Sequence, residues 1–149
     1  MLRRAVASAA VLWAAAIPVA ALAADGALGS AAYPFALVVY LIGSVVCHQR
    51  PARSFHLAAT SLPVCARCTG IYLGAALVAV VLIATRRLSA GSAGGRRIRT
   101  VMALAALPVA ATLALEWIGG RDPGNVIRAF SGMPLGAACG WAVCGAPKK

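Results

Sequence analysis

Residues Thr69–Thr85 read TGIYLGAALVAVVLIAT, an apolar run without a charged residue. Runs of about 20 apolar residues are long enough to cross the hydrocarbon core of a bilayer. Similar runs recur at residues 5–24, 31–46, 100–118 and 126–144. The chain has 149 residues and is 11% charged, whereas soluble domains usually carry roughly 25% charged residues. The pattern predicts an all-α fold, a polytopic membrane helix bundle with four or five transmembrane helices.

The N-terminal run allows two interpretations. Arg3 and Arg4 precede the apolar residues, and the Ala-Leu-Ala triplet at residues 21–23 is similar to a signal-peptide cleavage site. Residues 1–24 are therefore either a signal-like segment or a first transmembrane helix, which we favour because further runs follow. The rest of the chain divides into a membrane bundle at residues 31–146, its Cys/His connector at 47–68 and its Arg-rich linker at 86–99.

The net charge of +11 comes from 14 Lys and Arg against 3 Asp and Glu. Many of the basic residues gather in connectors such as 86–99, as the positive-inside rule predicts. Anionic lipid head groups attract such residues. We expect the lipid bilayer and no nucleic acid as partner, in a multi-pass protein of a bacterial inner cell membrane. The sequence leaves an oligomer open.

Counting the crossings places the Cys/His connector and the turn Gly119–Asn125 on one membrane face, called face X. The linker 86–99 then lies on the opposite face, called face Y. If the first run is a span, the N-terminus also lies on face X. The Lys and Arg residues then divide seven against seven, so the positive-inside rule gives no orientation.

The connector contains the set of residues most typical of a metal site. Cys65 and Cys68 form a C-x-x-C pair, and Cys47 and His48 stand together at its other end. Two separated Cys/His pairs are typical of zinc ligands. We predict that these four residues bind zinc or another transition metal, which would stabilise a loop without a core of its own. In the alternative for His48, its ring hydrogen-bonds a backbone carbonyl.

Charged and amide side chains surround this set in the predicted topology. Glu116 is the only acidic residue inside an apolar run, and an ionisable group there is a functional candidate. A salt bridge with Arg121 or Arg128 is the alternative. Arginine suits bidentate contacts with phosphate. Six residues are predicted to surround the metal or to bind an anionic ligand such as a lipid phosphate: Gln49, Arg53, Arg67, Asn125, Arg128 and Glu116.

Other residues have simpler interpretations. Gly70 and Gly74 form a G-x-x-x-G pattern that favours close helix packing. Cys139 and Cys144 are expected to be apolar fillers, far from the connector, and His56 is expected to be a surface loop residue.

Three strings carry a family resemblance: CHQRPARSF at Cys47–Phe55, LPVCARCTGIYLG at Leu62–Gly74 and NVIRAFSGMPLG at Asn125–Gly136. Together they resemble the domain-of-unknown-function 2085 family of small prokaryotic integral membrane proteins, over roughly residues 34–141. The resemblance implies that the matched positions matter, but it implies no activity. An Asp-Gly of the family pattern is replaced here by LEWIGG, where Glu116 would take the place of the Asp.

Three functions remain open from the sequence. The first is a metal-binding membrane protein. The second is a membrane thiol–disulfide oxidoreductase that uses Cys65 and Cys68, which requires face X to lie in an oxidising compartment. The third is a small transporter or accessory subunit. The sequence contains no nucleotide-binding glycine loop, serine triad or paired carboxylates, so it assigns no enzymatic reaction.

Overall fold

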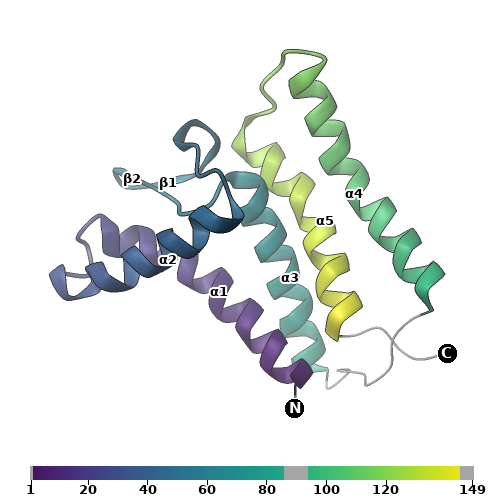
Figure 1. Cartoon of the computed structure of the whole chain (residues 1–149), viewed down its shortest axis with the longest axis horizontal. Helices are drawn as coiled ribbons and strands as arrows, with labels where there is room; N and C mark the ends of the chain where they lie inside the picture. Colours follow the sequence, from purple (N-terminus) through teal and green to yellow (C-terminus); the bar gives the residue numbers. More distant parts are fainter. Residues whose placement is uncertain (1, 86–93, 145–149) are drawn as a thin grey trace.

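The computed structural model describes residues 2–85 and 94–144, and these are almost entirely helical (Figure 1). The α-helices are α1 (Leu2–Ala24), α2 (Tyr33–Val46), α3 (Ala66–Ala84), α4 (Gly95–Trp117) and α5 (Gly124–Cys144). Short 3₁₀ turns η1 (Ser30–Ala32) and η2 (Pro51–Arg53) and the antiparallel strands β1 (His56–Leu57) and β2 (Thr60–Ser61) complete the chain. The predicted all-α helix bundle is confirmed.

Four of these helices, α1, α3, α4 and α5, are long and apolar enough to cross a membrane. The fifth apolar helix, α2, has 14 residues. At about 1.5 Å per residue it is roughly 21 Å long, which is shorter than the hydrocarbon core of about 30 Å. Figure 1 shows α2 running across the bundle rather than along it. The interpretation of residues 31–46 as a span is therefore wrong, and the structure has the lower of the two predicted numbers of spans.

The position of α2 also changes the predicted place of the N-terminus. The thiol of Cys144, at the end of α5, lies 3.8 Å from the carbonyl oxygen of Arg3. At its other end, α1 meets the connector, where the Asp25 carboxylate accepts hydrogen bonds from Ala59 N at 3.3 Å and Thr60 Oγ1 at 3.2 Å. Helix α1 thus begins on face Y and ends on face X. The prediction of an N-terminus on face X is wrong because it counted α2 as a crossing.

Helices α3 and α5 pack at backbone contact through glycines. A Cβ atom built on Gly70 would lie 1.9 Å from the carbonyl oxygen of Ala129, and one on Gly136 would lie 1.8 Å from that of Ile71. Gly74 and Gly132 are equally closed to a side chain. The packing role predicted for Gly70 and Gly74 is confirmed, and the four-residue spacing of the glycines in α5 continues the same seam.

The connector has a small core, contrary to the expectation of a loop without one. Val64 is fully buried and packs with Leu62 against Ile17 and Ala21 of α1. Cys47 and Cys68 lie against the same cluster, half-buried. Helix α1 therefore supplies the apolar surface that a short connector cannot provide for itself.

The Arg-rich linker is shorter than predicted. Its residues 86–93 lie outside the described part of the chain, and from Gly95 onward the chain is already helix α4. Arg96, Arg97 and Arg99 therefore belong to the first turns of α4, and the Arg97 guanidinium lies 5.5 Å from the ring centre of Trp141.

Candidate metal centre

Three cysteines of the connector meet in the folded chain. The Sγ atoms of Cys47, Cys65 and Cys68 all lie within 4.8 Å of one another. Thiolates around a tetrahedral zinc ion at 2.3 Å are separated by about 3.8 Å, so small side-chain rotations would bring these sulfurs to that spacing. Cys47 follows the end of α2, Cys65 is the residue before α3, and Cys68 lies in the first turn of α3. The cluster therefore forms where two helix ends are brought together.

Hydrogen bonds link the three cysteines and favour the thiolate form of Cys65. The backbone N–H of Cys65 donates to the Sγ of Cys47 at 3.2 Å. The side chain of Cys68 hydrogen-bonds to that of Cys65, and this interaction lowers the pKa of the Cys65 thiol to about 5. The thiolate is the form that binds metals. All five cysteines of the chain are free rather than joined in disulfides.

Gln49 fixes the distance between the two halves of the cluster. Its Nε2 donates to the carbonyl oxygen of Tyr40 in α2 at 2.7 Å and to that of Pro63 at 2.8 Å. Its backbone has a φ of 44°, a left-handed conformation that non-glycine residues rarely adopt. The side chain predicted to surround the metal or to bind an anion thus ties α2 to the residues just before Cys65.

A glycine makes this approach of α2 and the connector feasible. A Cβ atom on Gly43 would lie 2.4 Å from the Pro63 carbonyl oxygen and 2.8 Å from Gln49 Nε2. Gly43 was not among the residues predicted to matter from the sequence. The feature of the sequence that could have pointed to it is a glycine in the last turn of a helix of mostly bulky apolar residues.

Beside the cysteines, three arginines converge on Glu116, which is only 3% exposed. Its Oε1 accepts hydrogen bonds from Arg67 Nη2 and Arg128 Nε, both at 2.9 Å. Its Oε2 meets Arg53 Nη1 in a longer ion pair at 3.4 Å. The salt bridge with Arg128 was an alternative in the sequence analysis, whereas the partnership with Arg53 and Arg67 was not foreseen.

Asn125 and Arg128 join α5 to the connector. Asn125 donates from Nδ2 to the carbonyl oxygen of the buried Ser54 at 2.9 Å and accepts from Arg128 Nη1 at 3.2 Å. Arg128 is 3% exposed and also meets the exposed Asp122 at 3.2 Å. The three strings recognised in the sequence therefore meet at one place, on face X.

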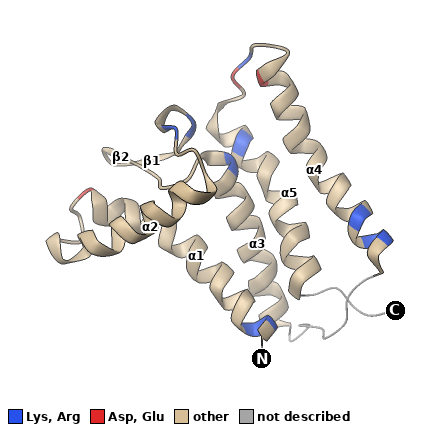
Figure 2. Ribbon diagram, viewed as in Figure 1, with Lys and Arg blue, Asp and Glu red and all other residues tan. Residues whose placement is uncertain are grey.

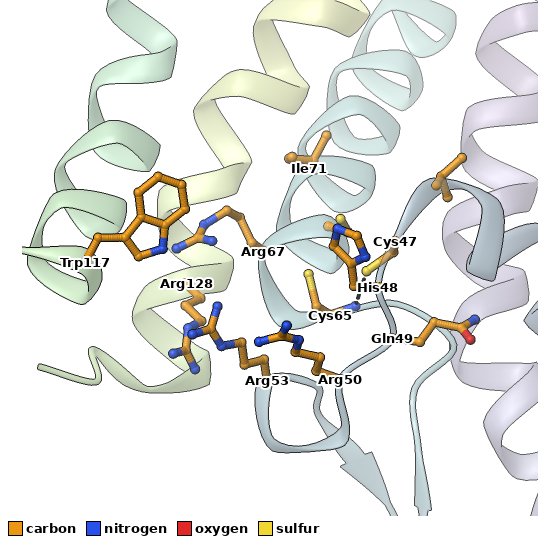
Figure 3. A pocket seen from close by; sticks show the side chains of 12 residues that line it. Cys47, His48, Gln49, Arg50, Arg53, Cys65, Arg67, Ile71, Trp117 and Arg128 are labelled. Carbon is orange, nitrogen blue, oxygen red and sulfur yellow. Dashed lines mark hydrogen bonds between the residues drawn. The ribbon is translucent and has the colours of Figure 1, made fainter. Parts of the chain in front are cut away.

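A cavity of about 470 Å³ opens beside the cysteine cluster (Figure 3). His48, Gln49, Arg53, Arg67 and Arg128 line it together with all three cysteines. The ring nitrogens of His48 are not among the ligand atoms that lie within 4.8 Å of one another. Four lining residues were not among the predicted site residues: Val46, Arg50, Ile71 and Trp117. Of these, Arg50 was expected near the cysteines because it belongs to the same connector.

The fold and this site define a class, a four-span membrane helix bundle with a three-cysteine cluster at one membrane face. The chain belongs to the family described as "Predicted membrane protein (DUF2085)", whose model matches residues 47–142. An uncharacterised protein of the archaeon Methanocaldococcus jannaschii is 29% identical over 100 residues, which are 67% of this chain and 62% of that protein. An uncharacterised protein of the archaeon Methanothermobacter thermautotrophicus is 36% identical over 96 residues, 61% of this chain and 78% of that protein. No solved structure matches the chain.

Proposed function

We propose that this membrane protein binds zinc or another transition metal through Cys47, Cys65 and Cys68 on face X. The observation that carries the proposal is the convergence of the three sulfurs within 4.8 Å. Three thiolates are a soft ligand set that suits zinc among other transition metals. His48 lines the same cavity and remains our predicted fourth ligand, reached by rotation of its side chain. Without it, the fourth position would be open to a water molecule or another ligand.

The charged residues around Glu116 extend this proposal to a second ligand, an anion that binds next to the metal. The cavity beside the cysteines has four arginines in its wall and no acidic residue among its described lining. A bound divalent ion with three thiolates would carry one negative charge, which leaves the wall electropositive overall. We propose that Arg53 and Arg67 attract an anionic ligand next to the metal, while Arg128, Asn125 and Gln49 hold the surrounding backbone in place.

The corrected topology supports an orientation for the protein. Face X carries five arginines, Arg50, Arg53, Arg67, Arg121 and Arg128, whereas Arg3 and Arg4 join Arg96, Arg97 and Arg99 on face Y (Figure 2). In the sequence, Arg86 and Arg87 follow α3 and Lys148 and Lys149 follow α5, all outside the described residues. The positive-inside rule then places face Y in the cytoplasm. We propose an inner cell membrane location with the metal centre on the outer side.

The packing of α1 supports its retention in the mature protein. Ile17 and Ala21 of α1 cover Leu62 and Val64 of the connector. Removal of residues 1–24 would expose this cluster beside Cys47 and Cys68. We therefore propose that the N-terminal segment is a transmembrane helix rather than a cleaved signal. The proposed orientation also meets the requirement of the disulfide-exchange alternative, an oxidising compartment at face X, whereas no specific observation favours the transport alternative.

The test is metal content. The full chain is purified in mild detergent without chelator, and metal per chain is measured by elemental analysis for wild type, Cys65→Ser and Cys139→Ser. We expect about one metal ion per chain in wild type and Cys139→Ser, and a loss in Cys65→Ser. His48→Ala shows whether His48 is the fourth ligand. If it is, the variant should bind the metal more weakly, and if the fourth position is open, metal affinity should not change. Equal metal content in wild type and Cys65→Ser would refute the proposal.

A further inference from the structure

The cavity beside the cysteine cluster has both cationic and apolar side chains in its lining. Arg50, Arg53 and Arg67 form the set called its cationic wall, and Val46, Ile71 and Trp117 form the set called its apolar wall. Trp117 is 77% exposed at the end of α4, one of the helices that can span the membrane. The cavity thus combines cationic and apolar side chains, and one of the apolar ones, Trp117, is largely exposed on a helix that can span the membrane.

The cationic wall holds more positive charge than its carboxylate partners balance. Four arginines line the cavity, and the acidic residues that pair with them in the described part of the chain are Glu116 and Asp122. Asp122 meets Arg128 from the exposed side of the site. The positive charge that remains beside the cavity favours an anionic ligand.

One donor also lacks an acceptor. Arg67 uses Nη2 for both Thr112 Oγ1 and Glu116 Oε1, at 3.2 and 2.9 Å. Its Nε is buried and has no hydrogen-bond partner in the described structure. A buried donor without a partner is costly, and the guanidinium edge of Arg67 lies in the cavity wall. Oε2 of Glu116 is likewise buried without a hydrogen-bond partner in that part of the chain. Because Nε is closed to solvent, an oxyanion in the cavity would become its acceptor after a shift of the Arg67 side chain.

We propose that this cavity binds a phosphate-class oxyanion carried by a lipid, with the head group at Arg50, Arg53 and Arg67 and the apolar part along Ile71 and Trp117. Guanidinium groups suit phosphate because their parallel N–H donors match its oxygens. The apolar wall favours a lipid phosphate over free phosphate. The inference rests on the proposed function for the location of the site and names its ligand class.

The experiment measures binding to the purified full chain in mild detergent. The probes are dioctanoyl phosphatidic acid, inorganic phosphate and dioctanoylglycerol, which separate the contributions of head group and chains. We expect phosphatidic acid to bind at least about 10-fold more tightly than either other probe, because it alone contacts both walls. Equal binding of inorganic phosphate would overturn the lipid source, and equal binding of dioctanoylglycerol would overturn the oxyanion site.

Variants connect the binding to the arginines. Arg53 is 39% exposed, so Arg53→Gln should fold, and we expect it to weaken phosphatidic acid binding about 10-fold or more. Arg121→Gln is the matched control, because Arg121 lies on face X but not in the cavity lining. Equal effects of the two variants would overturn the inference. Metal content is measured in the same samples, and a wild-type value in Arg53→Gln would show that lipid binding fails independently of the metal.

Discussion

The glycine seam between α3 and α5 gives the sharpest test of the fold, through the substitution Gly70→Ala. The new Cβ atom would lie 1.9 Å from the carbonyl oxygen of Ala129. Carbon–oxygen contacts in proteins are about 3.3 Å or longer, so the two backbones would have to separate by roughly 1.4 Å. The contact atom belongs to the backbone of a helix, so no side-chain rotation can relieve the overlap.

The energetic cost follows from this separation. A gap of about 0.5–1 Å already removes a quarter to a half of each van der Waals attraction across it. Overpacking of this kind costs about 1–3 kcal/mol or more, and alanine in a helix recovers about 0.5–1 kcal/mol of it. Because the overlap is between backbones, the cost is taken at the upper end, about 3 kcal/mol, and we expect a net loss of about 2–2.5 kcal/mol. For a chain of this size, the Tm should fall by about 4–10 °C.

The assay is thermal unfolding in mild detergent, followed by circular dichroism at one scan rate for all variants. The control is Gly95→Ala, since a Cβ atom on Gly95 would meet nothing within 4 Å. The control should keep the wild-type Tm or raise it slightly. A Gly70→Ala protein within about 2 °C of wild type would show that α3 and α5 do not pack at backbone contact.

Three further predictions follow from the site. Glu116→Gln keeps the side-chain shape but leaves Arg128 and Arg67 without their buried charge partner, so the free energy of unfolding should fall by about 3–5 kcal/mol. A wild-type free energy of unfolding, measured by chemical denaturation, would contradict the buried cluster. Gln49→Leu removes the hydrogen bonds to two carbonyl oxygens, so we expect the free energy of unfolding to fall by about 1–3 kcal/mol. We also expect a lower metal content, although Gln49 is not a ligand. Wild-type stability and wild-type metal content together would contradict its positioning role. A fluorescent protein fused after Lys149 should fluoresce in cells if face Y is cytoplasmic, and a dark, fully expressed fusion would reverse the orientation.

Much of the fold could be predicted because hydropathy alone fixes helices of membrane length. The predicted run at residues 126–144 and helix α5 end at the same residue, Cys144. The error at α2 has a physical cause: a 14-residue apolar helix satisfies the composition of a span but not its length. Composition does not say whether such a helix crosses the bilayer or lies across the ends of its neighbours.

The candidate site was partly predictable for a different reason. Cysteine chemistry is recognisable from residue type and spacing, so Cys47, Cys65 and Cys68 stood out before any contact was known. Contacts between distant segments leave no such pattern. The hydrogen bonds from Gln49 to Tyr40 and Pro63, and the convergence of arginines on Glu116, depend on how the helix ends are arranged in space.

The orientation and the metal proposal constrain each other. Because the short helix α2 does not cross the membrane, Arg3 and Arg4 lie on face Y rather than on face X. The Lys and Arg residues are then no longer divided equally between the faces but are in excess on face Y. In the proposed orientation, face X lies outside the cytoplasm, where oxidising conditions favour disulfides between neighbouring thiols. A metal ion that holds the three sulfurs as thiolates would protect them from oxidation there. A chain with face Y in the cytoplasm, free connector thiols and no metal would contradict the metal proposal.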